Sequence, residues 1–367
     1  MESLVFANIR QRPVRALVSV AGVALGVCLV MLFTGLTRGM SNDLHRRSSN
    51  IRAEIIFTRP GATEMLSSAA NLPTKYAELL REIDGVESAV PSIRYVSQAG
   101  RGFGFEQIEG VDWEPFARMN GMQLVEGRAP EGLDEVVIDE AKARNNSVGV
   151  GGTLRIFGDL PYKVVGIYTP EAGPRVKMSL AAMQDALERP DKATWIYVKA
   201  REGVSEEELA RRITAEPRME GNKIQFTRDV FTNVEKSIPY LGVFLRTLVV
   251  LAAIVSALVV MLAMYTTITE RTREIGVLKA LGASRGYIVG VIEKEAVVIS
   301  LLGLAVGFAV SLVAGYLISR AYGLLFEYSW SWAASAAGIG LLGGVLGALY
   351  PAVRAANLDP VNALSYE

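Results

Sequence analysis

Four long apolar runs dominate the pattern of hydrophobic and polar positions along the chain. They cover residues 16–36, 247–269, 296–318 and 333–353, and none of them contains Asp, Glu, Lys or Arg. The hydrocarbon core of a bilayer requires about 20 apolar residues in helical conformation. A helix inside a soluble protein rarely stays apolar on all its faces over that length. The pattern therefore predicts four transmembrane helices over these four ranges.

The first apolar run also has features of a signal peptide, because Arg10, Arg12 and Arg15 precede it. It is, however, longer than the roughly 7–15 apolar residues of a signal peptide, and no clear cleavage site of small residues follows it. We therefore interpret residues 16–36 as a retained transmembrane anchor.

Basic residues near the ends of the runs predict the orientation. Three arginines lie in residues 1–15, and five Lys or Arg residues lie in the loop 270–295. The loop 319–332 holds only Arg320. Because short loops rich in Lys and Arg stay in the cytoplasm, we expect an inner-membrane, multi-pass protein with both termini cytoplasmic. Residues 1–15 would be an amphipathic N-terminus and 354–367 a cytoplasmic tail, whereas 319–332 would be a short outer loop.

Residues 37–246, between the first two runs, have the mixed composition of a folded domain. Alternating apolar positions and Gly or Pro turns predict several strands, and amphipathic stretches predict helices between them. The expected strands are 53–58, 135–139, 153–157, 162–168 and 194–199, and the expected helices are 74–83, 179–188, one starting after Ser205, and a stalk over 229–238. The predicted fold is thus a membrane protein with four transmembrane α-helices and a large α+β extracytoplasmic domain inserted between spans 1 and 2.

The overall composition argues against most kinds of catalysis. Of 367 residues, 50% are hydrophobic and 21% are charged, with 38 basic and 38 acidic side chains. A net charge of zero gives no reason to expect nucleic acid as a partner. The single cysteine, Cys28, cannot form a disulfide within the chain. The single histidine, His45, excludes a zinc site with two histidines and argues against a Ser-His hydrolase. We expect no catalytic residue, metal or cofactor on this chain, which also lacks the phosphate-binding motif G-x-x-x-x-G-K-[ST].

The loop 270–295 contains a short amphipathic stretch, ERTREIGVLKALGASR, over 270–285. Ile275, Leu278 and Leu281 recur at helical spacing, and Gly282 is a helix stop signal. Such a helix could lie on the lipid surface or dock into a groove on a cytoplasmic partner. The residues alone leave both alternatives open.

Small residues four positions apart recur in the apolar runs and allow helices to approach closely. The pairs are Gly22 and Gly26, Gly303 and Gly307, Gly340 and Gly344, and Gly343 and Gly347. For the pairs in spans 3 and 4 we expect packing within one subunit.

Three segments resemble the FtsX/MacB-type permeases of ABC transporters, a family that includes lipoprotein-release, macrolide-exporter and DevC-like permeases. They are the stretch 270–285, the N-terminal stretch 7–26 and the C-terminal stretch 350–364, and the resemblance extends over the whole chain in order. In that family the loop between spans 2 and 3 is the coupling helix that fits into the ATPase subunit. The resemblance assigns ATPase coupling to Arg273, Glu274, Ile275, Gly276, Leu278, Lys279, Leu281 and Gly282. We expect the apolar residues to fill a groove, Glu274 and Lys279 to pair with charges at its rim, and Gly276 to allow close backbone approach.

The resemblance also implies partners. The family layout predicts two copies of an ABC ATPase subunit, a separate polypeptide that would carry ATP and Mg²⁺, and a second permease copy or a paralogue. It places Gly22 and Gly26 in the dimer interface. Membrane lipid surrounds the spans, and a periplasmic adaptor and an outer-membrane channel are further partners that the layout allows.

The implied function is non-catalytic. ATP hydrolysis on the partner would change the shape of the periplasmic domain, by mechanotransmission, and drive export or extraction of a lipid, lipoprotein, peptide or hydrophobic drug. The first alternative is an FtsX-like regulator that transmits ATPase motion to periplasmic cell-wall hydrolases. Two others are a membrane-anchored sensor without an ATPase, and haem efflux that uses His45.

Overall fold

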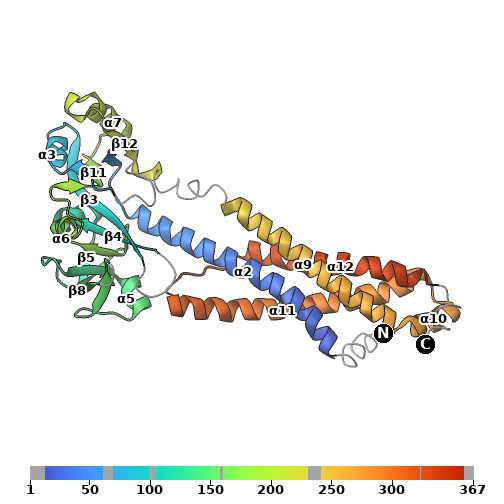
Figure 1. The fold of residues 1–367 in the computed structure, drawn as a ribbon. Helices are drawn as coiled ribbons and strands as arrows, with labels where there is room; N and C mark the ends of the chain where they lie inside the picture. The colour runs from blue at the N-terminus through green and yellow to red at the C-terminus, as the bar shows by residue number, and fades with distance from the viewer. Residues whose placement is uncertain are drawn as a thin grey trace. The chain divides into compact units, whose positions relative to one another are not determined.

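The structure is a computed structural model that describes residues 13–60, 69–98, 105–157, 160–229, 241–322 and 324–358. The chain forms two compact units (Figure 1). The first comprises residues 1–40, 240–319 and 324–367, and the second comprises 41–239 and 320–323.

Within the described residues, five helices build the first unit. Their bounds are α2 Pro13–Ser49, whose last turns belong to the second unit, α9 Leu241–Glu270, α10 Thr272–Ala280, α11 Arg285–Tyr322 and α12 Trp330–Ala356. Four of them, all except α10, are long and apolar enough to cross a membrane. The prediction of four spans is therefore confirmed.

The helices extend beyond the apolar runs that predicted them. α11 begins at Arg285, and α2 continues to Ser49 through Arg46 and Arg47. A run of apolar residues reports the stretch that suits a bilayer, whereas a helix continues for as long as each N–H finds the carbonyl four residues earlier. Most of the predicted loop 270–295 is consequently helical.

A buried apolar cluster joins the spanning helices. It includes Val23 and Val27 of α2, Val260 of α9, Ile299 of α11 and Ala348 of α12. Large side chains on the other faces stay exposed in the isolated chain, such as Leu258 of α9 and Leu346 of α12. This distribution suits helices that contact one another on one side and lipid on the other.

A ten-stranded mixed sheet forms the centre of the second unit. Its order is β12-β1-β11-β3-β4-β9-β6-β8-β5, with β7 also paired to β8, and β10 and β2 form a separate two-stranded sheet. The strands are β1 Ile55–Thr58, β2 Leu72–Pro73, β3 Val86–Gln98, β4 Phe105–Val111, β5 Gln123–Gly127, β6 Glu135–Asp139, β7 Thr153–Ile156, β8 Leu160–Thr169, β9 Val176–Met178, β10 Lys192–Ala193, β11 Trp195–Ala200 and β12 Lys223–Phe226. The helices are α3 Tyr76–Arg81, α4 Trp113–Asn120, α5 Glu140–Asn146, α6 Leu180–Ala186 and α7 Glu206–Ala215, followed by a 3-10 turn over Pro217–Met219.

Helices cover both faces of this sheet. Phe116 and Met119 of α4 pack on one face, whereas α3 and α7 cover the other face beside β1 and β11, and α6 covers it beside β4 and β9 (Figure 1). Strands in the middle of such a sheet are buried on both sides. All four residues of β1 are buried. An alternation of apolar and polar residues therefore cannot distinguish the two faces of this strand.

Each predicted strand and helix of this domain that lies in the described residues is present. The structure also contains elements that were not predicted. The side chains of Ser179 and Ser205 accept the N–H groups of Ala182 and Glu208 and start α6 and α7, as N-caps do. The longest strand, β3, and its neighbour β4 were not predicted. All of the predicted stalk over 229–238 except Asp229 lies outside the described residues.

Candidate functional site

The short helix α10 lies in the chain between the long helices α9 and α11. Gly282 ends it with φ of +92°, a left-handed conformation that favours glycine. The N–H groups of Gly282 and Ala283 donate to the carbonyls of Lys279 and Leu278, at 3.0 Å each. The side chain of Ser284 then accepts the N–H of Tyr287, at 3.2 Å, and starts α11. Local chemistry thus separates α10 from the next helix within a few residues.

One face of α10 is held by the rest of its own chain. Ile275 is 8% exposed and joins the apolar cluster that includes Ile288 of α11 and Ala355 of α12. Gly276 is buried as well. The Lys279 Nζ donates to the carbonyl of Ala356 at 2.9 Å and also to that of Leu358. Since carbonyls at the end of a helix carry partial negative charge, this lysine caps α12.

These contacts involve three of the predicted coupling residues, whose roles toward a partner stay predictions. Ile275 was expected to fill a partner's groove, Gly276 to allow close backbone approach, and Lys279 to pair with a charge at the groove's rim. In the structure Ile275 fills the chain's own core and Lys279 is engaged by α12. The reason is geometric: at 3.6 residues per turn, steps of three residues drift around the helix. Ile275 and Leu281 therefore lie about 120° apart rather than on one face.

The opposite face of α10 is open. The exposed fractions of Val277, Leu278 and Leu281 are 44%, 41% and 80%. Arg273, Glu274 and Gly282 are also exposed. Four of the eight predicted coupling residues therefore share this face: Arg273, Glu274, Leu278 and Leu281; Gly282 is exposed just beyond the end of the helix. Val277 was missed, although its spacing of four residues from Arg273 and from Leu281 marks the same face.

Ion pairs brace the start of α10. Arg271 lies 3.8 Å from a carboxylate oxygen of Glu274 and 3.9 Å from one of Glu295 on α11. The Arg271 and Glu295 side chains are mostly buried, whereas that of Glu274 is 73% exposed. Glu274 is thus available for a further partner on its open side.

The glycine pairs mark close contacts between helices of one chain. A Cβ added to Gly303 or Gly307 of α11 would lie within 3 Å of α2 atoms, and one added to Gly347 of α12 would lie 2.4 Å from the Ala257 carbonyl oxygen of α9. One added to Gly344 would lie 1.9 Å from the Ser300 hydroxyl oxygen. The predicted packing within one subunit is therefore observed for these spans.

Gly22 and Gly26 lie close to α9 of the same chain. A Cβ added to Gly22 would lie 2.4 Å from Val259, and one added to Gly26 would lie 2.6 Å from the Ser256 hydroxyl oxygen. These contacts lie within one chain, and the role of the two glycines in a dimer interface stays a prediction.

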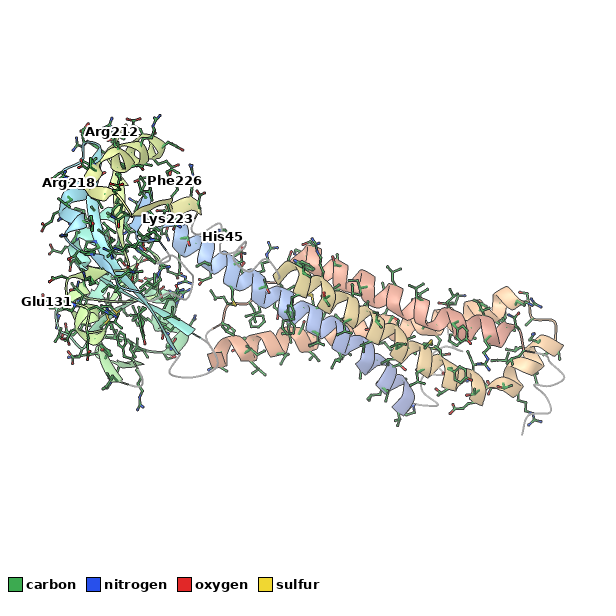
Figure 2. All side chains as sticks on the ribbon, turned by 45° about the horizontal axis from the view of Figure 1, so that its top comes forward. His45, Glu131, Arg212, Arg218, Lys223 and Phe226 are labelled. Carbon is green, nitrogen blue, oxygen red and sulfur yellow. The ribbon has the colours of Figure 1, made fainter. Side chains whose placement is uncertain are left out.

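The described residues contain no group of three or more His, Cys, Asp or Glu side chains that could hold a metal ion. His45 is exposed on the last turns of α2 (Figure 2). The open face of α10 is the candidate functional site, because it presents three exposed apolar side chains next to one acidic and one basic residue.

Two family profiles match the chain and together cover most of it. Residues 16–216 match the MacB-like periplasmic core domain, and residues 246–360 match the FtsX-like permease C-terminal region. The boundary between the two profiles lies close to the start of α9, so the second profile covers the candidate site.

Curated relatives align along almost the whole chain. The macrolide export ATP-binding/permease protein MacB of Escherichia coli is 28% identical over 96% of this chain and 58% of the relative. The MacB of Shewanella sp. (strain ANA-3) is 27% identical with the same coverage. The chain thus spans 58% of the length of these relatives.

A solved structure of the periplasmic region of MacB from Actinobacillus actinomycetemcomitans is 18% identical, covers 53% of this chain and 98% of that structure, and has a TM-score of 0.38. The family assignment rests on the two profiles, of which the first alone matches more than half of the chain. The chain belongs to the family of ABC transporter permeases that have a MacB-like periplasmic core domain and an FtsX-like permease region.

Proposed function

We propose that this chain is the permease subunit that receives the motion of an ABC ATPase through the open face of α10 and passes it to the periplasmic domain. The observation that carries the proposal is the division of α10 into two faces. Ile275 and Lys279 fasten the helix to its own chain, whereas Val277, Leu278 and Leu281 remain exposed. A helix fastened on one side and apolar on the other is suited to transmit a push from a partner.

The apolar face favours a protein groove over a lipid surface as its occupant. Helices that lie on lipid usually carry several Lys or Arg residues on the polar side of a broad apolar face. Here the exposed apolar residues are flanked by one acid, Glu274, and one base, Arg273. A patch of three apolar side chains with one charge of each sign fits a groove with a polar rim.

The ATPase would be a separate polypeptide that carries ATP and Mg²⁺, and two copies would serve a pair of permeases. The transported molecule would be a lipid, lipoprotein, peptide or hydrophobic drug, and both termini and α10 would be cytoplasmic. The curated relatives are named for macrolide export, which supports an exporter rather than the FtsX-like regulator.

The test uses the full chain expressed in its native membrane with a purification tag. Leu278→Asp and Leu281→Asp place charges on the open face without touching the buried face. We expect the amount of ATPase that co-purifies to fall at least about tenfold, because burying an unpaired carboxylate in an apolar groove costs more than the roughly 1.4 kcal/mol that a tenfold change requires. Leu160→Asp is the matched control, since Leu160 is an exposed leucine of the second unit.

Equal recovery of ATPase with the Leu281→Asp and Leu160→Asp chains, both correctly inserted, would overturn the proposal. Binding of the purified wild-type chain to anionic vesicles through α10, in the absence of any ATPase, would favour the sensor instead. Proteins that co-purify from the periplasm distinguish the two remaining candidates: an adaptor supports export and a cell-wall hydrolase supports regulation.

A further inference from the structure

The last turns of α2 are bonded to the loop 170–175 between β8 and β9. Arg47 donates a side-chain N–H to the Gly173 carbonyl at 2.9 Å, and the Gly173 N–H donates to the Arg47 carbonyl at 3.1 Å. The Asn50 side-chain amide donates to the Glu171 carbonyl at 2.6 Å. Three hydrogen bonds thus fasten the end of this spanning helix to one loop of the α/β unit.

Arg175, at the end of this loop, bridges α2 and the sheet. One guanidinium nitrogen lies 2.5 Å from the Asp43 carboxylate on α2, and the other lies 2.8 Å from the Asp139 carboxylate at the end of β6. Asp139 also accepts the N–H of Lys142 and so caps α5. The three side chains are at most 15% exposed. A planar guanidinium with two carboxylates fixes both the distance and the orientation of the elements it joins.

A second ion pair supports the same loop from the side of the sheet. The Lys177 Nζ on β9 lies 2.6 Å from the Glu109 carboxylate on β4, and both side chains are fully buried. Lys177 also donates to the Pro174 carbonyl at 3.1 Å, and the Tyr168 hydroxyl donates to that carbonyl at 3.0 Å. The loop therefore lies between α2 on one side and a buried charge pair on the other.

The loop approaches this pair closely at Gly173. Its φ is +60°, and an added Cβ would lie 3.3 Å from a Glu109 carboxylate oxygen and 3.5 Å from Ile51. A residue with a side chain would be strained here by both its backbone conformation and its neighbours. The loop is thus held closely between Ile51, just after α2, and Glu109 of the sheet.

The chemistry of this junction is unusual for a purely stabilising contact. Apolar side chains of similar volume often stabilise a buried position as well as an ion pair does, because burying charges costs desolvation energy. Ion pairs instead favour one defined arrangement of the elements they connect. The arrangement here joins α2 to β6 through Arg175, and it joins the loop 170–175 to β4 through Lys177 of β9.

We propose that Asp43, Arg175 and Asp139, supported by Lys177 and Glu109, form the joint that transfers a displacement of α2 to strands β6 and β9 of the periplasmic domain. This inference rests on the proposed function, which supplies the displacement. Arg175 is a positioning residue in this scheme, and its partner on α2 is Asp43.

The first test needs no ATPase. Amide hydrogen exchange is measured on the full chain in lipid nanodiscs for wild type, Asp43→Asn and the control Arg218→Gln, which breaks exposed ion pairs with Glu82 and Glu216. We expect Asp43→Asn to speed exchange about tenfold in both 41–50 and 171–175, because a hydrogen bond to a charged group contributes about that factor or more. Unchanged exchange in 171–175 would overturn the joint.

The second test adds the ATPase that co-purifies with the wild-type chain. The change in amide exchange on ATP binding is followed in 135–139 and 176–178. We expect a response in wild type and in Arg218→Gln, and its loss in Asp43→Asn, while ATP hydrolysis and complex assembly persist. A full response in Asp43→Asn would overturn the joint.

The two proposals fail separately in these tests. A wild-type complex without any ATP response would contradict the proposed function, and the first test would still decide whether Asp43 holds the loop. A variant Asp43→Glu, which keeps the charge, is expected to retain much of the wild-type response. Loss of the response in Asp43→Glu and Asp43→Asn alike, with 171–175 still protected, would count against the ionic joint.

Discussion

The helices of the first unit and the strands of the second are held against their neighbours by different kinds of contact. Between helices, glycines such as Gly303 and Gly347 let backbones approach so closely that an added Cβ would collide with the neighbouring helix. Inside the sheet, Arg94, Glu109 and Lys177 stand side by side on β3, β4 and β9. Close packing in the first unit thus depends on glycines, which have no side chain, whereas the sheet of the second unit contains buried charged side chains that pair with each other.

The difference follows from what surrounds each unit. Helices in a bilayer gain little from apolar burial, because lipid is as apolar as their side chains, so close van der Waals packing and small residues decide which faces meet. In water, apolar burial drives the sheet and its helices together but does not select one arrangement. Buried ion pairs then add a preference for one register, at a cost in desolvation.

The largest expected effect comes from breaking the buried charge pair. Lys177→Met leaves the Glu109 carboxylate buried with Arg94, 3.9 Å away, as its remaining charged neighbour among the ion pairs described. We expect the free energy of unfolding of the second unit to fall by about 3 kcal/mol. Chemical unfolding of the full chain in detergent measures the change, with the fluorescence of the buried Trp195 as the signal.

Two further variants sharpen this result. Lys223→Met removes an exposed lysine of β12 (Figure 2) and is expected to change the unfolding free energy by less than about 0.5 kcal/mol. Glu109→Gln combined with Lys177→Met is expected to recover most of the lost stability, since the fully buried carboxylate is then removed and Arg94 keeps the Tyr197 hydroxyl and the Trp195 ring as partners. Equal unfolding of Lys177→Met and wild type would show that the pair does not stabilise the sheet.

A smaller effect is expected where backbones meet. Gly347→Ala would place a Cβ 2.4 Å from the Ala257 carbonyl oxygen and force α12 away from α9. Overpacking of this kind costs about 1–3 kcal/mol. Thermal unfolding of the full chain in nanodiscs measures it.

Gly338→Ala is the matched control in the same helix, because an added Cβ there meets no atom within 4 Å. It is expected to leave the unfolding temperature unchanged or slightly raised, since alanine favours helix over glycine. If both alanine variants behave alike, the close approach of α9 and α12 does not limit stability.

The smallest expected effect is a pH dependence of the unfolding free energy that comes from Glu109 in the second unit. Burial alone would raise the pKa of the Glu109 carboxyl, but Lys177 and Arg94 outweigh burial and hold the pKa below its ordinary value of 4.5. A lowered pKa in the folded state means that ionised Glu109 stabilises the fold above pH 4.5, and that this contribution is lost as the pH falls below it. Burial lowers the pKa of the Lys177 ammonium group.

The unfolding free energy of wild type should therefore fall relative to that of the double variant Glu109→Gln and Lys177→Met as the pH falls below 4.5. Other carboxyls titrate in both chains, so the comparison cancels their contributions to stability. One of them is Asp139, whose pKa is raised by burial, so that its contribution changes with pH in the opposite direction. A constant difference between the two chains over this range would contradict a lowered pKa at Glu109.

Local properties of the sequence were sufficient for several parts of the fold. The four spans follow from the length of the apolar runs, and the starts of α6 and α7 follow from Ser179 and Ser205, because a cap needs only the next three residues. The resemblance of 270–285 to a coupling helix located the candidate site. The matched family profiles agree with the family assignment, and the coupling role of this segment stays a prediction.

What only the tertiary structure decided depends on elements distant in sequence. Lys177 and Glu109 each lie between apolar residues, a pattern that suggests a solvent-facing side chain, but the order β3-β4-β9 and helix α4 place them in the core. Likewise, the spacing of Ile275, Leu278 and Leu281 could not show which face of α10 would meet α12. Strand order, and the neighbours of each helix face, are set by long-range packing, for which a single sequence holds no local signal.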